Sequence, residues 1–219
     1  HQEIIIKQDE YFKDLDKMIY HLDEPYGGGL PLWHVFKEAG KKFGVILTGL
    51  GGDELFGNFG RWTLLEKSYF NLTNNYQQFK ILFFDRKFFF TDNLKNKLLL
   101  NENQKFENTS ELMFNKLFSS NSKNIRDKIF NLDLTNQLPD EYCNMINKFS
   151  MANHIEARAP FLDNEFTNLM FKIPSKIRTS KSDFKYLLRK TMKNIIPEES
   201  INNRKRGFVG LESQKINYK

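Results

Sequence analysis

The stretch VILTGLGGDELFG, from Val45 to Gly57, decides how the surrounding chain is expected to fold. Its first three residues form a short apolar run that begins with a β-branched side chain and predicts a strand. Glycines stand at three of the next five positions, and the acidic pair Asp53 and Glu54 then opens a segment typical of a helix start. A strand, a glycine-rich turn and a helix in this order indicate a parallel α/β unit.

The glycine-rich turn allows two interpretations. Because Gly49, Gly51 and Gly52 lack a Cβ, the backbone there can take positive φ, approach a ligand closely and turn several N–H groups toward one anion. The carboxylates of Asp53 and Glu54 would repel a phosphate unless Mg²⁺ or a substrate ammonium lay between them. The other interpretation is a tight turn with capping acids. The turn alone leaves both open, because it is neither a dinucleotide-binding motif nor a P-loop.

The segments before the turn predict a strand and two helices. Residues 3–7 contain an apolar run typical of a buried strand, and apolar residues at helical spacing predict a helix over 9–22. Pro31 is a favourable first residue for a second helix, which Gly44 is expected to end. The inner face of this helix is predicted to comprise Leu32, Val35, Phe36, Ala39 and Phe43.

The segments after the turn predict helices. Pro and Gly are absent from residues 61–138, where Phe-rich stretches such as ILFFDRKFFF at 81–90 indicate core packing. Pro139 is expected to start a helix that runs to about Phe149, and Asp163 and Ser182 are expected to cap two further helices. The residues predicted to face inward from these two are Phe166, Leu169, Met170 and Ile173, then Phe184, Leu187, Leu188, Met192 and Ile195.

The chain of 219 residues has ordinary globular composition, with 40% hydrophobic and 27% charged residues. It contains no apolar run near the ~18 residues of a membrane span. The single cysteine, Cys143, rules out an intrachain disulfide and fits a reducing, cytoplasmic location. The four His have no partner at a metal-binding spacing. The net charge is +6, because residues 172–219 carry +9 and the rest of the chain carries −3. A basic segment of this kind indicates either an anionic partner or solvated helix faces.

Four segments carry a resemblance to a known family. They are TGLGGDELFG at 48–57, SMANHIEARAPFLD at 150–163, KYLLRK at 185–190 and NRKRGF at 203–208. In this order they resemble motifs of the synthetase domain of asparagine synthetases and their relatives, including β-lactam synthetase. The resemblance implies a predominantly helical α/β fold: residues 1–60 are a partial adenine-nucleotide alpha-hydrolase-like (ATP-pyrophosphatase) parallel sheet, and residues 61–219 are a large helical section of the same domain.

The resemblance also implies ATP-dependent amide formation. A carboxylate is adenylated, pyrophosphate leaves with Mg²⁺, and an amine attacks the acyl-adenylate. The implied partners are ATP, Mg²⁺, an aspartate-like carboxylate and ammonia or glutamine. A homodimer is possible. Neither a membrane nor a nucleic acid is an expected partner.

The same resemblance assigns roles to individual residues. Lys185, Glu156 and Asp53 match catalytic positions, and Asp53 also matches a position at either the substrate end or the Mg²⁺ end of the site. Arg158 and Asp163 are expected to form a structural ion pair. The residues expected to contact substrate or nucleotide are Thr48, Gly49, Leu50, Gly51, Gly52, Arg189 and Lys205.

Three departures from the family pattern modify this expectation. The pyrophosphate motif S-G-G-x-D-S is absent from the 219 residues, so we expect a fragment that is inactive alone. A glutaminase domain is also absent. Leu50 stands where asparagine synthetases carry Glu and cannot accept a proton. The acceptor is therefore either aspartate or a different carboxylate, such as one on a glycan or peptide. A further alternative is a catalytically dead binding module with a basic tail.

Overall fold

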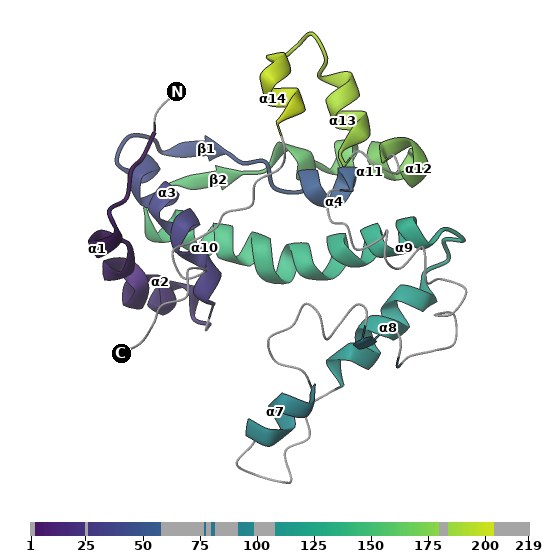
Figure 1. Cartoon of the computed structure of the whole chain (residues 1–219), viewed down its shortest axis with the longest axis horizontal. Helices are drawn as coiled ribbons and strands as arrows, with labels where there is room; N and C mark the ends of the chain where they lie inside the picture. Colours follow the sequence, from purple (N-terminus) through teal and green to yellow (C-terminus); the bar gives the residue numbers. More distant parts are fainter. Residues whose placement is uncertain are drawn as a thin grey trace. The chain divides into compact units, whose positions relative to one another are not determined.

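The structure, a computed structural model, describes residues 3–24, 26–57, 77, 80–81, 92–98, 108–179 and 184–203. These residues are mostly helical and contain a small parallel sheet of two strands (Figure 1). The chain divides into two compact units whose segments alternate along the sequence. The first unit comprises His1–Gly51, Leu138–Phe166 and Met192–Lys219, and the second comprises Gly52–Gln137 and Thr167–Thr191. No helix in the described parts of the chain is long and apolar enough to cross a membrane.

The sheet of the first unit pairs β1, Val45–Leu47, with β2, Glu156–Arg158, in parallel (Figure 1). Val45 lies opposite Glu156, and the Thr48 N–H extends the ladder by donating to the Arg158 carbonyl at 2.8 Å. The strand predicted at 45–47 is thus confirmed. The sequence analysis did not predict β2, because Glu-Ala-Arg is a segment of low strand propensity without apolar alternation.

The helices of the first unit pack around large buried side chains. Trp33 and Phe149 are fully buried and meet edge to face, with ring centroids 5.3 Å apart. Met18 and Phe36 belong to the same cluster, so the helices that flank the sheet share one core. The helical elements are α1 Gln8–Tyr11, η1 Phe12–Asp14, α2 Leu15–Leu22, η2 Gly27–Gly29, α3 Leu30–Gly40, α10 Asn144–Ala152, η5 Pro160–Leu162 and α14 Glu198–Asn202.

Two predictions for the first unit were wrong. Residues 3–7 form no strand, and Ile5 is 88% exposed. In the described residues β1 pairs only with β2, so the 3–7 segment lacks the neighbour that a strand needs for its backbone hydrogen bonds. The second helix ends at Gly40 rather than at Gly44. The carbonyl of Gly44 instead accepts the N–H of Glu156 and so continues the β ladder.

The second unit contains α4 Gly52–Phe56, α7 Asp92–Leu98, α8 Thr109–Ser119, α9 Ile125–Leu132, α12 Ser175–Arg178 and α13 Tyr186–Thr191. Its core cluster includes Leu117, Ile129 and Phe130. The core role predicted for the Phe-rich segment at 81–90 falls outside the described residues, except for Ile81, which is 57% exposed.

Two elements span the limits of the units, namely η4 Asp133–Cys143 and α11 Asn164–Lys172. Pro139 does not start a helix as predicted, because it lies inside η4, a π-helical segment. Pro139 has no N–H to donate to the helical ladder, and it interrupts the backbone hydrogen bonds of η4 at this position. Asp163 caps α11 as predicted, since its Oδ1 accepts the N–H groups of Glu165 and Phe166 at 3.0 Å each.

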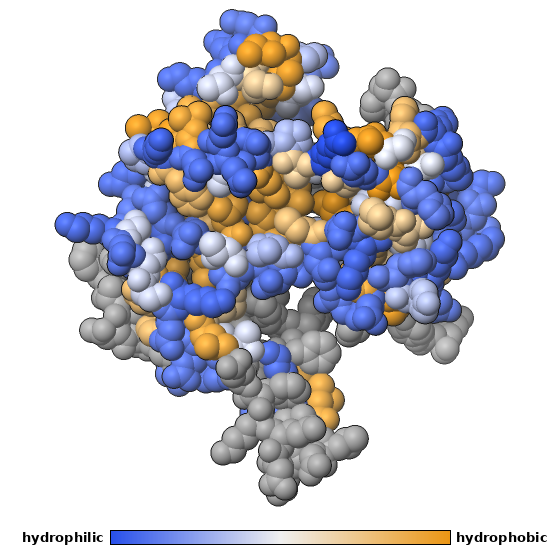
Figure 2. All heavy atoms as spheres, turned by 180° about the vertical axis from the view of Figure 1, so that it is seen from behind, coloured by the Kyte–Doolittle hydropathy of each residue, from blue (hydrophilic) through white to orange (hydrophobic). Residues whose placement is uncertain are grey.

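The predicted inward faces of α11 and α13 are correct only in part. Met170 is buried, but Leu169 on the same helix is 54% exposed. Phe184 and Ile195 are 39% and 70% exposed, and the predicted cap Ser182 lies outside the described residues. Figure 2 shows apolar surface among polar surface on one face of the molecule. Helical spacing alone therefore did not identify which apolar side chains are covered.

Candidate functional site

The structure brings Asp53 and Lys185 together within the second unit. Asp53 is in the first turn of α4, and Lys185 lies in the turn that leads into α13. Lys185 Nζ is 2.5 Å from Asp53 Oδ1, and the two side chains are 28% and 24% exposed. The helices α4 and α13 contact each other directly. This ion pair is therefore half-shielded from solvent, in a setting where a charge interaction is stronger than at an open surface.

The backbone of Lys185 takes an unusual conformation. Its φ of 57° lies in the left-handed region, which residues other than glycine seldom occupy. Such conformations persist where the surrounding structure enforces them, and they cluster at functional sites. The carbonyl of Lys185 accepts the N–H of Arg189 at 2.9 Å, so these two residues are one helical turn apart.

Glu54 is the buried acid of the site. It is next to Asp53 on α4, and its side chain is only 3% exposed. Burial, together with the nearby carboxylates of Asp53 and Asp133, raises the pKa of Glu54 to about 7, although a backbone hydrogen bond and the charge of Lys185 act to lower it. Glu54 is thus partly protonated at neutral pH, whereas Asp53 presents its carboxylate to an ammonium.

The turn between β1 and α4 requires glycine at one position in particular. Gly51 has φ 87°, and a Cβ there would meet the side chain of Leu162. Gly49 has no neighbouring atom within 4 Å of a built Cβ, so neither crowding nor a positive φ demands glycine there. Positive φ was predicted as a possibility at Gly49, Gly51 and Gly52, and of these three it is found at Gly51.

The other predicted loop residues flank this position. Thr48 is partly buried, and its hydroxyl donates to the Arg158 carbonyl at 3.2 Å, which ties the end of β1 to β2. Leu50 is half-buried in the turn, and Gly52 is the buried first residue of α4.

Glu156 and Arg158 pair with each other on β2 in the first unit. Arg158 Nε donates to Glu156 Oε1 at 2.8 Å, and both side chains are more than half exposed. This hydrogen bond and the arginine charge lower the pKa of Glu156. The predicted pairing of Arg158 with Asp163 is therefore wrong, because Asp163 is occupied in capping α11.

Neither the predicted contact residue Lys205 nor a group of side chains arranged to hold a metal ion is found among the described residues. Lys205 lies outside the described residues. In the part of the chain that is described, no group of three or more His, Cys, Asp or Glu side chains is arranged to hold a metal ion.

The sequence analysis missed Arg178, the last residue of α12. Its side chain is 1% exposed, and it donates to the carbonyl of Leu55 on α4. No local pattern distinguishes this arginine from the other basic residues of 172–219. Its burial depends on contacts with residues distant in the sequence.

Comparison with known proteins places these residues in a family. A sequence model of asparagine synthase matches residues 1–217. The chain is 28% identical over 242 residues to glutamine-hydrolysing asparagine synthetase 1 of Bacillus subtilis (strain 168), covering 93% of this chain and 37% of the relative. It is 23% identical over 239 residues to a protein of Mycobacterium tuberculosis (strain ATCC 25618 / H37Rv) named "Putative asparagine synthetase", covering 93% of this chain and 36% of that protein.

The chain spans a little over a third of the length of these curated relatives. The family match covers nearly all of the 219 residues, including the turn before α4, the β2 segment and the Lys185 segment. The chain therefore belongs to the asparagine synthase family.

Proposed function

We propose that this chain is the C-terminal part of an ATP-dependent amide-forming ligase that adenylates a carboxylate and transfers nitrogen to it. The observation that carries the proposal is the 2.5 Å ion pair between Lys185 and Asp53. It joins two segments, TGLGGDELFG and KYLLRK, that are far apart in the sequence and that both resemble family motifs. The parallel pair β1–β2 supports, within the same proposal, a partial adenine-nucleotide alpha-hydrolase-like sheet.

The roles proposed for the side chains follow from their charges. The Lys185 ammonium stabilises the negative charge that develops on the phosphate of the acyl-adenylate, and the carboxylate of Asp53 orients it. Arg189, one turn further along α13, adds a second cation suited to phosphate oxygens. Glu156 is proposed to accept a hydrogen bond from the attacking amine, and the hydrogen bond and charge of Arg158, which lower its pKa, favour the ionised form that this role requires.

The residues of the second unit fit a Mg²⁺ ion. Mg²⁺ is usually held by one or two carboxylates together with substrate phosphates, so Asp53 alone is sufficient from this chain. When bound, the ion supplies positive charge that neutralises the leaving pyrophosphate. Of the two acids of α4, Asp53 is the more accessible to an ion, because the side chain of Glu54 is buried.

The test is AMP release by the full-length protein, supplied with Mg²⁺, ATP, a carboxylate and ammonia or glutamine. We expect Lys185→Ala to abolish AMP release, because it removes the cation that the acyl-transfer step requires. Lys190→Ala is the matched control, since Lys190 is an exposed lysine of α13 that lies over the Tyr186 ring. AMP release at the wild-type rate by the Lys185→Ala protein would refute this role.

One observation favours a second acceptor class. Leu50 places an apolar side chain in the turn where asparagine synthetases carry Glu, which is compatible with a carboxylate other than aspartate, such as one on a glycan or peptide. The non-catalytic alternative predicts instead that the full-length protein releases no AMP with any carboxylate and binds RNA with a steep salt dependence. Assays of AMP release with several carboxylates and of RNA binding therefore distinguish an enzyme with another acceptor from a non-catalytic binding module.

A further inference from the structure

We infer that Arg178 is a positioning residue, whose buried guanidinium holds α4 in the orientation that presents Asp53 to Lys185. Arg178 Nη1 donates to the Leu55 carbonyl at 2.8 Å, two residues beyond Asp53 in the chain. The role of α4 in activity rests on the proposed function, but the anchoring of α4 can be tested by itself.

The helix α4 needs an external anchor because it has only five residues. Isolated helices shorter than about 12 residues are marginal in water, so the orientation of α4 depends on its tertiary contacts. The Gly57 N–H closes its last turn by donating to the Asp53 carbonyl at 3.0 Å. The Leu55 carbonyl, near the negative end of the helix dipole, receives its hydrogen bond from Arg178.

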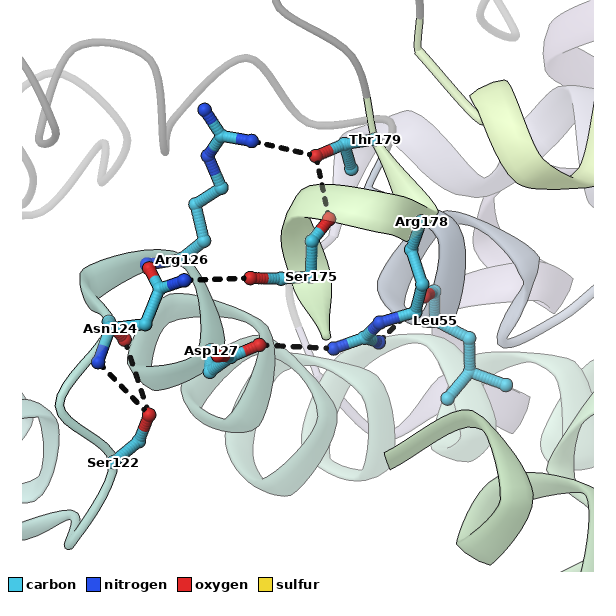
Figure 3. Close-up of polar contacts among 8 residues, drawn as sticks. All are labelled: Leu55, Ser122, Asn124, Arg126, Asp127, Ser175, Arg178 and Thr179. Atoms are coloured by element: carbon cyan, nitrogen blue, oxygen red, sulfur yellow. Dashed lines mark hydrogen bonds and ion pairs between the residues drawn. The ribbon is translucent and has the colours of Figure 1, made fainter. Parts of the chain in front are cut away.

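The guanidinium joins three elements of the second unit (Figure 3). It belongs to α12, donates to α4 at Leu55, and forms an ion pair with Asp127 of α9 at 3.3 Å. Its carbon lies 5.1 Å from the centroid of the Phe130 ring, also on α9. A charged group that is 1% exposed requires such partners, because an unpaired buried charge is strongly destabilising.

The region around Arg178 is fixed by further hydrogen bonds. Thr179 Oγ1 accepts from Arg126 at 3.1 Å and donates to the Ser175 carbonyl at 2.9 Å (Figure 3). Gly57 has φ 71°, and a Cβ there would meet the side chains of Thr179 and Phe130. The end of α4 thus fits closely against α12 and α9, and Arg178 is the charged contact in this packing.

The chain offers a matched control for this role. Lys128 is a buried cation on α9, 7% exposed, and its Nζ donates to the carbonyls of Ser120 at 2.7 Å and Phe118 at 3.4 Å. It therefore caps the end of α8 in the way that Arg178 caps α4. Replacing either residue removes one buried cation from the second unit, but only Arg178 caps the helix that bears Asp53.

The experiment compares Arg178→Met and Lys128→Met in the full-length protein by hydrogen exchange and by AMP release. We expect Arg178→Met to speed amide exchange in residues 52–57 by about tenfold or more, the factor that corresponds to the loss of one such hydrogen bond. We expect kcat for AMP release to fall about 100-fold, as for a displaced catalytic group, with the KM for ATP little changed. Lys128→Met is expected to speed exchange at the end of α8 and to leave α4 and kcat unchanged.

Arg178→Lys provides a second variant if Arg178→Met fails to fold. A lysine retains the buried charge, but it lacks the planar guanidinium that donates to two partners at once. The amide exchange rate in residues 52–57 and the kcat of the Arg178→Lys protein should therefore lie between those of wild type and Arg178→Met. Wild-type exchange in residues 52–57 of either folded Arg178 variant would overturn the anchoring role. An equal loss of kcat in Lys128→Met would reduce Arg178 to a general stabilising residue. Absence of AMP release from the wild-type protein would refute the proposed function, while the exchange comparison would still decide the anchoring role.

Discussion

At the scale of single residues, Asp14 shows how one carboxylate can connect two helical segments of the first unit. It belongs to η1, and its Oδ2 is 2.5 Å from Lys37 Nζ and 3.6 Å from His34 Nδ1, both on α3. Burial alone would raise the pKa of Asp14, but the hydrogen bond and charge of Lys37, the indole of Trp33 and the charge of His34 together lower it. Asp14 therefore stabilises the folded state in its ionised form.

This lowered pKa predicts a pH-dependent effect of Asp14→Asn. A carboxyl whose pKa is lowered by folding contributes stability above its unfolded value, here 3.8, and that contribution disappears as the pH falls through the folded value. We expect the variant to be about 1 kcal/mol less stable than wild type at pH 7, since Lys37 is partly exposed. The difference should shrink as the pH drops below about 4.

Urea unfolding of the full-length protein at neutral and acidic pH measures this difference, with tryptophan fluorescence as the signal. Asp9→Asn is the control, because Asp9 is an exposed acid of the preceding helix. A stability difference that is the same at both pH values would contradict the ion-pair explanation for Asp14.

The residues of the candidate site differ in how far they could be predicted. The resemblance of short motifs selected Asp53 and Lys185, and the structure places them 2.5 Å apart. Residue type alone would not have paired them, because Lys185 lies among many basic residues. The burial of Arg178 and of Glu54 could not be predicted from the sequence, since burial depends on which distant segments pack together.

At the scale of elements, local patterns predicted helices and caps better than they predicted strands. The N-cap of α11 at Asp163 and the strand β1 were both predicted, because each rests on a few neighbouring residues. The segment 3–7 has strand-like composition and forms none, whereas β2 lacks such composition and forms one. A strand depends on its partner, and the partner of β1 is more than a hundred residues away in the sequence.

The cap of α11 provides a prediction at this scale. Asp163→Ala removes the oxygen that accepts the N–H groups of Glu165 and Phe166, and we expect a loss of about 1 kcal/mol in stability. Asp163→Asn retains an acceptor oxygen and should lie close to wild type. Thermal unfolding of the three proteins measures the effect. If the Ala and Asn variants lose equal stability, the charge of Asp163 rather than its capping hydrogen bonds is responsible.

At the scale of the whole molecule, the proposed function leads to a prediction about the carboxylate that the full-length protein activates. The apolar Leu50 predicts that aspartate is a poor acceptor and that restoring a carboxylate at this position improves it. We expect Leu50→Glu to raise AMP release with aspartate relative to its release with other carboxylates. The measurement is AMP release across a panel of free amino acids, peptides and acidic glycans. Wild-type AMP release that is highest with aspartate would favour asparagine formation and contradict this prediction.

The pairing of β1 with β2 also governs when the first unit can be completed during synthesis. The hydrogen bond from Thr48 to Arg158 joins positions 110 residues apart in the chain. At roughly 5–20 residues per second, a ribosome takes about 5–20 s to produce that interval. For this time the nascent β1 lacks the β2 partner to which its backbone is bonded in the folded chain, and an unpaired strand edge is prone to non-native pairing during synthesis.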